Sequence, residues 1–347
     1  MTVLSVAYPL APVRENTAGG AEQVLAMLDA ALTRAGHHSV VVACEGSRVT
    51  GTLVATPRHD GPFNERAILD AQARHRAAIR NALGLWPADV IHMHSQDFDA
   101  YLPDAGVPVI VTLHVPFEWY GPAAMSANAH YVFVSETQRR AWPAAPRNFS
   151  VIPNGVDAEA FRTRVTKRGF ALALGRVAPE KGTALALEAA RRAGVPMLVA
   201  GEVYRYAAHE RYFREEVAPL LDGSLRVFVG RLRLARKRRL LTAARCVVAA
   251  SRVAETSSLT AMEAMACGTP VVAFPAGALA EIVEHGRTGF VVNSVDEMAA
   301  AIRHAGAIDP SECRRAARER FPASRTIAAY FQLYETLAGS RAWSLSA

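Results

Sequence analysis

The sequence predicts an α/β protein built from two doubly wound domains whose parallel sheets face one central cleft. Short runs of apolar, mostly β-branched residues alternate with longer helical patterns, which is typical of parallel strands joined by crossover helices. The alternation starts again after residues 154–157. The chain has 347 residues, which are too many for one comfortable hydrophobic core and enough for two.

The first domain is expected over residues 1–160. Apolar runs predict its strands, and amphipathic patterns predict its helices. The first helix is expected to stop at Gly36, because glycine commonly ends helices. The strands are expected at 3–8, 39–43, 90–92, 109–113, 131–134 and 150–152, and the helices at 20–35 and 64–83.

The second domain is expected over residues 161–325 and repeats the same alternation. A last helix, at 326–338, is expected to pack back onto the first domain. The strands of the second domain are expected at 170–174, 197–200, 226–229, 246–249, 271–273 and 290–292, and its helices near 183–193, 206–220, 235–244, 258–266, 278–284 and 295–305.

Composition narrows the class of protein. No stretch approaches the roughly 20 uninterrupted apolar residues that a membrane span needs. The four cysteines are scattered, without a CxxC pair, which argues against a disulfide framework or a zinc site. They favour a reducing compartment, so the protein is expected in the cytoplasm, either free or peripheral on the inner face of the membrane. The cysteines are Cys44, Cys246, Cys267 and Cys313.

The net charge of +7 is shared unevenly between the two halves. Residues 1–160 hold 11 Lys and Arg against 15 Asp and Glu, whereas residues 161–347 hold 28 against 17. A basic half suits an anionic ligand, a nucleic acid or an anionic membrane surface. The densest basic run, residues 231–239, is interpreted as an exposed, solvated helix start, with weak contact to a membrane surface as the alternative.

The segment 255–273 carries the strongest chemical signal. It follows a predicted strand and opens a helix near Ser258, so backbone N–H groups and the helix dipole form an anion site there. Glu255 lies in the entry loop and Glu263 within the helix, and their carboxylates can accept hydrogen bonds from the vicinal hydroxyls of a ribose or hexose. The alternative is that Glu255 only complements the helix start and Glu263 is a solvated helical residue.

Further segments fit the same chemistry. Gly19 and Gly20 precede a helix, where glycine lets the backbone approach a ligand and leaves N–H groups facing it. An ordinary tight turn is the alternative. Arg176 ends a predicted strand and can bind phosphate oxygens in a fork, and Lys181 adds a point charge one loop further on.

Taken together and in order, these segments resemble the family 4 glycosyltransferases of the GT-B fold. The resemblance extends over residues 1–338. Each segment alone is a weak signal, but the ordered set is specific. The matching segments are 19–22, 153–157, 175–182, 255–273 and 281–292.

The resemblance implies a role for each matching residue. Glu263 would bind the ribose of the donor nucleotide, and Glu255 the hydroxyls of the transferred sugar. Arg176 and Lys181 would neutralise the diphosphate, and His114 would lie near the reacting sugar. His114, Glu255, Arg176 and Lys181 therefore form the predicted catalytic set. The predicted donor-binding set is Gly19, Gly20, Asn154, Arg176, Lys181, Leu232, Glu255, Ser258, Leu259 and Glu263.

The implied reaction is transfer of a sugar from a nucleoside-diphosphate sugar to a hydroxyl acceptor, with the anomeric configuration retained. No cofactor or divalent metal is expected beside the donor, since two cations face the diphosphate. The acceptor, a glycan, a lipid-linked sugar or a small molecule, would meet the loops 45–64 and 115–128. Where many members of the family have Gly/Pro-Phe-Gly, this chain has Thr256–Leu259, which leaves the sugar selectivity open.

Two other classes remain as alternatives. A sugar-nucleotide epimerase or a phosphorylase could use the same architecture. A non-enzymatic protein that binds nucleic acid or membranes through residues 231–239 would show salt-sensitive binding and no stabilisation by a donor. The motif set favours the enzyme and does not favour a nucleic-acid partner.

Overall fold

A computed structural model describes residues 1–14, 17, 19–121, 128–142 and 146–344. It divides the chain into two compact units. The first unit holds Met1–Pro153 together with the chain from Thr326 onward, and the second holds Asn154–Arg325. The first division thus falls after Pro153, where the sequence pattern had suggested residue 160.

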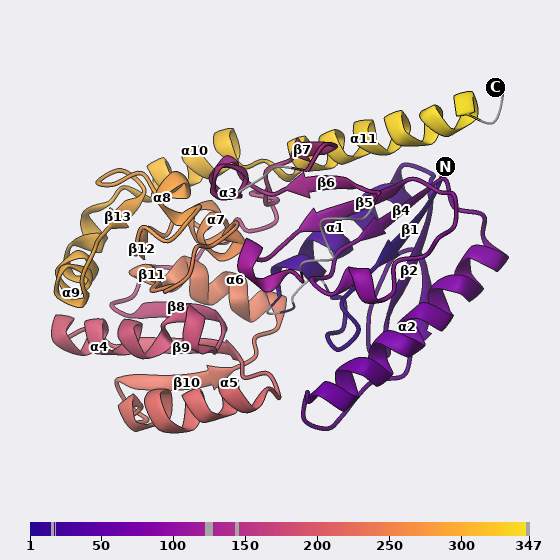
Figure 1. Cartoon of the computed structure of the whole chain (residues 1–347). Coiled ribbons are helices and arrows are strands. Elements are labelled where there is room, and N and C mark those ends of the chain that lie inside the picture. Colours follow the sequence, from indigo (N-terminus) through magenta and orange to yellow (C-terminus); the bar gives the residue numbers. More distant parts are fainter. Residues whose placement is uncertain (15–16, 18, 122–127, 143–145, 345–347) are drawn as a thin grey trace. The chain divides into compact units, whose positions relative to one another are not determined.

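The first unit is built on a seven-stranded sheet in the order β3-β2-β1-β4-β5-β6-β7, and every neighbouring pair is parallel (Figure 1). The chain steps outward from β1 in one direction and then restarts at β4 in the other, which makes the sheet doubly wound. The strands are β1 (Thr2–Val6), β2 (His38–Cys44), β3 (Thr52–Thr56), β4 (Val90–Met93), β5 (Val109–Leu113), β6 (His130–Phe133) and β7 (Phe149–Val151).

Strand β3 corrects the sequence interpretation, which placed residues 45–64 in a loop. The strand lies at the edge of the sheet and is only partly buried, so it lacks the strong apolar pattern of the inner strands. A buried carboxylate anchors its start. Asp29 accepts hydrogen bonds from the N–H groups of Thr50 and Gly51 and from the hydroxyl of Ser39 on β2.

The helices of the first unit are α1 (Gly20–Arg34), α2 (Glu65–Leu85) and α3 (Glu136–Ala141), besides a C-terminal helix described below. The side chains of Asn64 and Ser135 cap α2 and α3 by accepting N–H hydrogen bonds, which stabilises the first turn of each helix. Helix α3 was not predicted, because six residues are too few to show a helical period.

The second unit contains a six-stranded parallel sheet in the order β10-β9-β8-β11-β12-β13. Alternate residues of its strands enter separate apolar clusters, with Leu172 and Val271 in one and Ala171 and Val272 in the other. Both faces of the sheet are therefore covered, which explains the continuous apolar runs. The strands are β8 (Ala171–Arg176), β9 (Met197–Glu202), β10 (Arg226–Gly230), β11 (Cys246–Ala249), β12 (Val271–Ala273) and β13 (Gly289–Val291).

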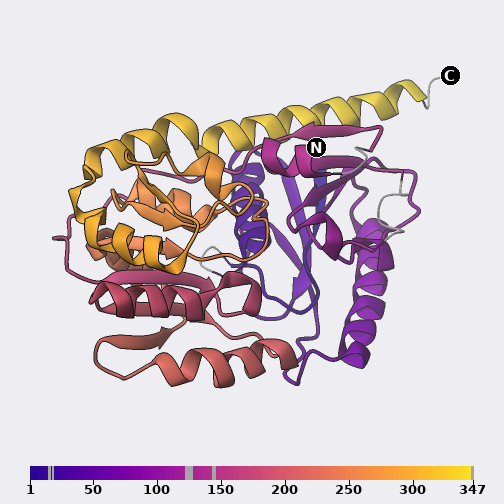
Figure 2. The same cartoon turned by 60° about the vertical axis from the view of Figure 1, so that its left-hand side comes forward.

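Helices cover this second sheet, as Figures 1 and 2 show. Helix α5 continues through a π-helical turn over Phe213–Val217, and α10 had no counterpart in the sequence interpretation. The helices are α4 (Thr183–Ala193), α5 (Ala207–Tyr212), α6 (Leu234–Ala243), α7 (Leu259–Ala266), α8 (Leu279–Ile282), α9 (Val295–His304) and α10 (Pro310–Arg320).

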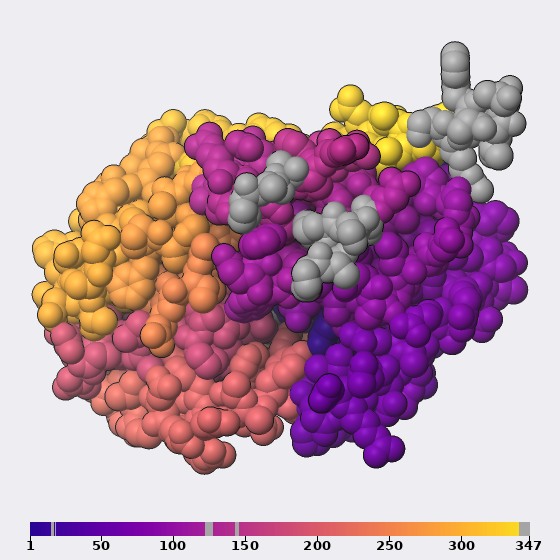
Figure 3. All heavy atoms as spheres, viewed as in Figure 1, coloured from indigo at the N-terminus to yellow at the C-terminus, as the bar shows by residue number. Residues whose placement is uncertain are grey.

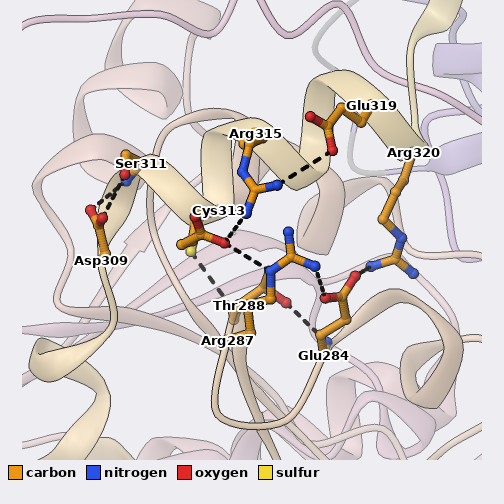
Figure 4. A network of polar contacts seen from close by, with 10 residues as sticks. Glu284, Arg287, Thr288, Asp309, Ser311, Cys313, Arg315, Glu319 and Arg320 are labelled. Carbon is orange, nitrogen blue, oxygen red and sulfur yellow. Dashed lines mark hydrogen bonds and ion pairs between the residues drawn. The ribbon is translucent and has the colours of Figure 1, made fainter.

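A network of ion pairs joins α10 to the turn before β13 (Figure 4). The guanidinium group of Arg287 lies 2.8 Å from the Glu312 carboxylate on α10 and 2.5 Å from that of Glu284. Arg320, at the end of α10, lies 2.6 Å from the other oxygen of Glu284. Because several charges share partners, the network fixes this turn better than isolated surface pairs would.

The C-terminal helix α11 (Ala323–Ser344) belongs to the first unit from Thr326 onward. It extends beyond the predicted range 326–338, where Gly339 and Ser340, both poor helix formers, weaken the sequence signal. The hydroxyl of Thr326 donates to the carbonyl of Pro153. Figures 1 and 2 show the yellow helix running along the strands of the first unit, and in the space-filling view its atoms adjoin those of the purple segments (Figure 3).

Two buried tyrosines tie α11 to the first sheet. The hydroxyl of Tyr334 lies 2.8 Å from Nδ1 of His92 on β4, and the hydroxyl of Tyr330 lies 2.9 Å from Oγ1 of Thr112 on β5. His92 Nε2 and Thr112 Oγ1 are themselves 2.7 Å apart. All four side chains are buried, so each hydrogen bond satisfies a polar atom that has no access to water.

Removing the Tyr334 hydroxyl should destabilise the first unit. Tyr334→Phe leaves Nδ1 of buried His92 without this partner, and an unsatisfied buried polar atom costs about 1–3 kcal/mol. Tyr330→Phe should lower the free energy of unfolding by less, because the Thr112 hydroxyl keeps its hydrogen bond with His92. Urea unfolding of both variants measures the difference. Equal midpoints for Tyr334→Phe and the parent protein would show that the hydrogen bond does not stabilise the fold.

Candidate functional site

In each sheet the strand order creates one switch point, where two neighbouring strands are followed by crossovers that run in opposite directions. In the second sheet β8 and β11 are neighbours, and the crossovers that leave them run in opposite directions. Ligands of doubly wound proteins bind at the carboxyl ends of the strands at such a switch point. The loop that bears Lys181 follows β8, and the loop that bears Glu255 follows β11.

A close backbone approach holds these two loops together. Gly182 has φ +62°, and a Cβ atom there would lie 2.0 Å from the carbonyl oxygen of Ala250. Any other residue would clash with this backbone atom, so glycine is required. The N–H of Arg252 also donates to the carbonyl of Glu180 at 2.8 Å. The positions of Lys181 and Glu255 are therefore fixed relative to each other.

Lys181 and Glu255 form an ion pair at this edge. The Lys181 ammonium lies 2.6 Å from Oε1 and 2.8 Å from Oε2 of Glu255. The hydroxyl of Ser251, a residue that the sequence interpretation passed over, also donates to Oε1. The two charged side chains are 29% and 13% exposed, so a ligand from solution can still reach the pair.

Arg176 ends β8 at the same edge but has other partners. Its guanidinium group lies 3.4 Å from the Glu180 carboxylate and 5.9 Å from the ring centroid of Tyr204. Nearby His209 is buried, and burial lowers its pKa, although the charge of Glu180 opposes this. Sequence reasoning missed Glu180 as a partner of Arg176, because a spacing of four residues indicates a side-chain pair only on a helix, and Arg176 ends a strand.

 The Ser258 hydroxyl caps α7 by accepting a hydrogen bond from the N–H of Ala261 at 3.4 Å. Leu259 is the first helical residue, and N–H groups in the first turn of a helix have no partner within the helix. The start of α7 thus presents donors and the positive end of its dipole next to the Glu255 loop.

Glu263 lies inside the second unit rather than on a solvated helix face. Its Oε1 is 2.6 Å from the ammonium group of Lys237 on α6, and the two side chains are only 3% and 7% exposed. This corrects the interpretation of residues 231–239 as a solvated run, because Lys237 occupies the buried side of α6. Arg231, Arg233, Arg236 and Arg239 are exposed.

Two other predicted donor-binding residues are also buried in the second unit. Leu232 is 6% exposed and belongs to an apolar cluster, so only its backbone is suited to contact a polar ligand. Asn154 is 5% exposed, and its side-chain oxygen has no hydrogen-bond partner within the described part of the chain. These positions remain predictions.

In the first unit the predicted site residues lie after strands of the sheet. Gly19 and Gly20 follow β1, and His114 follows β5, both at the carboxyl edge of the sheet. Gly19 and Gly20 start α1, where Gly19 is the N-cap. A Cβ atom on Gly19 would lie 1.9 Å from a carboxylate oxygen of Glu22, so this glycine leaves room for the Glu22 side chain. The structure thus supplies a packing reason for Gly19 besides the predicted ligand contact.

His114 follows β5 and pairs with a second histidine. Its Nε2 lies 3.1 Å from Nδ1 of His94, which follows β4, and the two rings are stacked. The ring centroids of His92 and His94 are 3.8 Å apart. Burial lowers the pKa of His114 to about 3 and that of His94 well below its usual range. Both imidazoles are therefore neutral near pH 7.

Within the described residues, no group of three or more His, Cys, Asp or Glu side chains is arranged to hold a metal ion. The four cysteines are buried and unpaired with one another. None of the helices in the described ranges combines the length and apolar character that a membrane crossing requires.

Two family models match the chain. The model described as Glycosyltransferase Family 4 matches residues 18–160, and the model described as Glycosyl transferases group 1 matches residues 169–306. The first match lies within the first unit except for its last residues, and the second lies within the second unit.

Individual relatives extend over nearly the whole chain. Glycogen synthase of Mycobacterium tuberculosis is 28% identical, covering 92% of this chain and 89% of that protein. Phosphatidyl-myo-inositol mannosyltransferase of Mycolicibacterium smegmatis is 27% identical over 95% and 93% of the two chains. The structure of Anabaena HepE in complex with UDP-glucose has a TM-score of 0.73 at 20% identity, covering 98% and 100%, which shows a shared fold.

The histidines of the first unit should make the protein sensitive to acid. His75, His92, His94 and His114 have folded-state pKa values below the ordinary 6.5, chiefly because of burial. Between about pH 6.5 and about pH 4 the unfolded chain therefore binds more protons than the folded one, so stability falls as the pH falls. Each such histidine contributes up to about 1.4 kcal/mol per pH unit.

Urea unfolding midpoints at about pH 7.5 and about pH 5 measure this effect. His304→Gln, at an exposed histidine of α9, serves as the control and should keep the acid sensitivity of the parent protein. Equal midpoints at the two pH values would contradict the neutral state of the buried histidines.

Proposed function

This chain belongs to the family 4 glycosyltransferases of the GT-B fold, and from that premise we propose that it transfers a sugar from a nucleoside-diphosphate sugar to a hydroxyl acceptor with retention of the anomeric configuration. The observation that carries the proposal is the Lys181–Glu255 ion pair at the switch point of the second sheet. It combines a cation suited to a phosphate with a carboxylate suited to sugar hydroxyls.

Donor binding would exchange the partners of this pair. The diphosphate takes the Lys181 ammonium, which frees Glu255 to accept hydrogen bonds from hydroxyls of the transferred sugar. Arg176 and the N–H groups at the start of α7 add positive charge at the same strand edge. Negative charge grows on the diphosphate as its bond to the sugar breaks, so these fixed donors stabilise the transition state without a divalent metal.

The acceptor oxygen would attack the anomeric carbon on the face that the diphosphate leaves. The bond from the anomeric carbon to the phosphate oxygen breaks, the bond to the acceptor oxygen forms, and the acceptor proton passes to the departing phosphate. His114, kept neutral by burial, would position the sugar by hydrogen bonding rather than by charge. Glu263 would bind the donor ribose, and the backbone near Leu232 its base.

The proposed acceptor is a hydroxyl group of a glycan, a lipid-linked sugar or a small molecule. The relatives are named for glycogen synthesis and for phosphatidyl-inositol mannosylation, so their acceptors differ. Phe117 and Trp119, both 37% exposed, are suited to stack on a sugar or a lipid-linked acceptor. The HepE complex makes UDP-glucose a reasonable first donor to test. We propose a cytoplasmic location, because the four cysteines are scattered and form no disulfide with one another.

Substitution of Lys181 tests the donor site. A thermal-shift screen of nucleotide sugars first identifies a stabilising donor. With that donor, Lys181→Met should lower kcat by about 10²–10³-fold, because one preorganised positive charge beside the leaving group is lost. Arg191→Met removes a surface charge of the same sign from α4 and should leave kcat unchanged. Initial rates with the parent protein and both variants give the three kcat values to compare. Parent-like rates for Lys181→Met would refute the assignment.

Product analysis tests the reaction type. Nucleoside diphosphate should be released only when an acceptor is present, and proton NMR of the product should show the anomeric configuration of the donor. An epimerase would instead convert the nucleotide sugar without acceptor and without releasing nucleoside diphosphate. A product of opposite anomeric configuration would contradict retention while leaving sugar transfer intact.

A further inference from the structure

The buried ion pair between Lys237 and Glu263 is unusual for its position. Lys237 shares the buried side of α6 with Leu241, one helical turn later, where an apolar side chain would ordinarily pack. Its ammonium group lies 2.6 Å from Glu263 Oε1 on α7, and both residues are more than nine-tenths buried. The basic residues around it, such as Arg236 and Arg239, are exposed, so Lys237 differs from its neighbours in the run.

Stability alone does not account for this pair. Removing two charges from water costs about as much as their attraction returns, and an apolar pair of similar volume often gives an equally stable protein. A lysine at this position is therefore better explained by what it does to Glu263 than by its contribution to folding.

The pair leaves one oxygen of Glu263 uncommitted. Oε1 accepts from Lys237, whereas Oε2 is buried and has no hydrogen-bond partner within the described ranges. A buried carboxylate oxygen without a donor is unfavourable, and a ligand hydroxyl that donates to it relieves that cost. The carboxylate is thus held at one oxygen and ready to accept at the other.

The surroundings of Lys237 keep the ammonium group in place. The ring centroid of Phe161 lies 5.6 Å from Nζ of Lys237 and 5.4 Å from Cζ of Arg238. The pKa of Glu263 is raised, because the effect of burial outweighs the charges of Lys237 and Arg238, which lower it. Lys237 therefore opposes protonation of a carboxyl group that burial alone would tend to neutralise.

We propose that Lys237 is a positioning residue of the donor site, which holds Glu263 through Oε1 and presents Oε2 to a ribose hydroxyl of a nucleoside diphosphate. This inference rests on the ribose contact proposed above for Glu263. It makes Lys237 a determinant of specificity, because a carboxylate fixed in this way distinguishes a ribonucleotide from an analogue that lacks the hydroxyl.

Binding measurements with deoxy analogues test the proposal. Isothermal titration calorimetry with UDP, GDP and ADP, and with the 2′-deoxy and 3′-deoxy forms of whichever binds, gives a ratio of dissociation constants. For the parent protein the ratio for at least one deoxy form should be about tenfold or more, as expected for a hydrogen bond to a charged group. The ratio is insensitive to a loss of folded protein, because both ligands meet the same sample.

Lys237→Met should bring this ratio close to one, whereas Arg236→Met, which removes an exposed charge from the same helix, should keep the parent value. Loss of one partner of a buried ion pair is destabilising. If Lys237→Met does not fold, Lys237→Gln replaces it, since the amide keeps a donor without the charge and should give an intermediate ratio. In a Glu263→Gln background, Lys237→Met should change nothing further.

The outcomes separate the two proposals. If none of the three nucleotides binds, or if Glu263→Gln keeps the parent ratio, the proposed donor contact fails and this inference fails with it. If Glu263→Gln removes the discrimination but Lys237→Met or Lys237→Gln retains it in full, only the role of Lys237 is overturned. An effect of Lys237→Met that persists in the Glu263→Gln background would also overturn it.

Discussion

The Lys181–Glu255 ion pair depends on a packing constraint in the backbone. The loops after β8 and β11 approach so closely at Gly182 and Ala250 that no side chain fits between them. That approach fixes where a cation and a carboxylate meet, at the point where the winding of the sheet reverses. The remaining groups of the second unit, Arg176 and the start of α7, take their positions from the same strand ends.

The second unit holds two ion pairs of different character. Lys181 and Glu255 keep some access to solvent, so a phosphate can compete for the lysine at modest cost. Lys237 and Glu263 are almost fully buried, so separating them would leave an uncompensated charge in a medium of low dielectric. The first pair is suited to exchange partners during a reaction, and the second is suited to hold one geometry.

The histidine cluster of the first unit consists of neutral polar groups. Its histidines are buried against one another and against tyrosines of α11, and burial keeps their imidazoles uncharged. A neutral imidazole can orient a hydroxyl by hydrogen bonding without adding charge. The C-terminal helix thus belongs to the hydrogen-bonding core of this unit, although its sequence lies beyond the second unit.

The sequence by itself determined the two parallel α/β sheets, because apolar runs and helical periods are local. It also singled out Lys181 and Glu255 as candidates, because ligands of such folds bind just after the strands. It overlooked β3, α3 and α10, whose patterns are short or half-exposed. Only the tertiary structure decided which charges pair. His92 and Tyr334 are 242 residues apart, and Lys237 meets Glu263 only because α6 packs on α7 with one particular side buried. Such pairings depend on packing between distant segments, which no local pattern records.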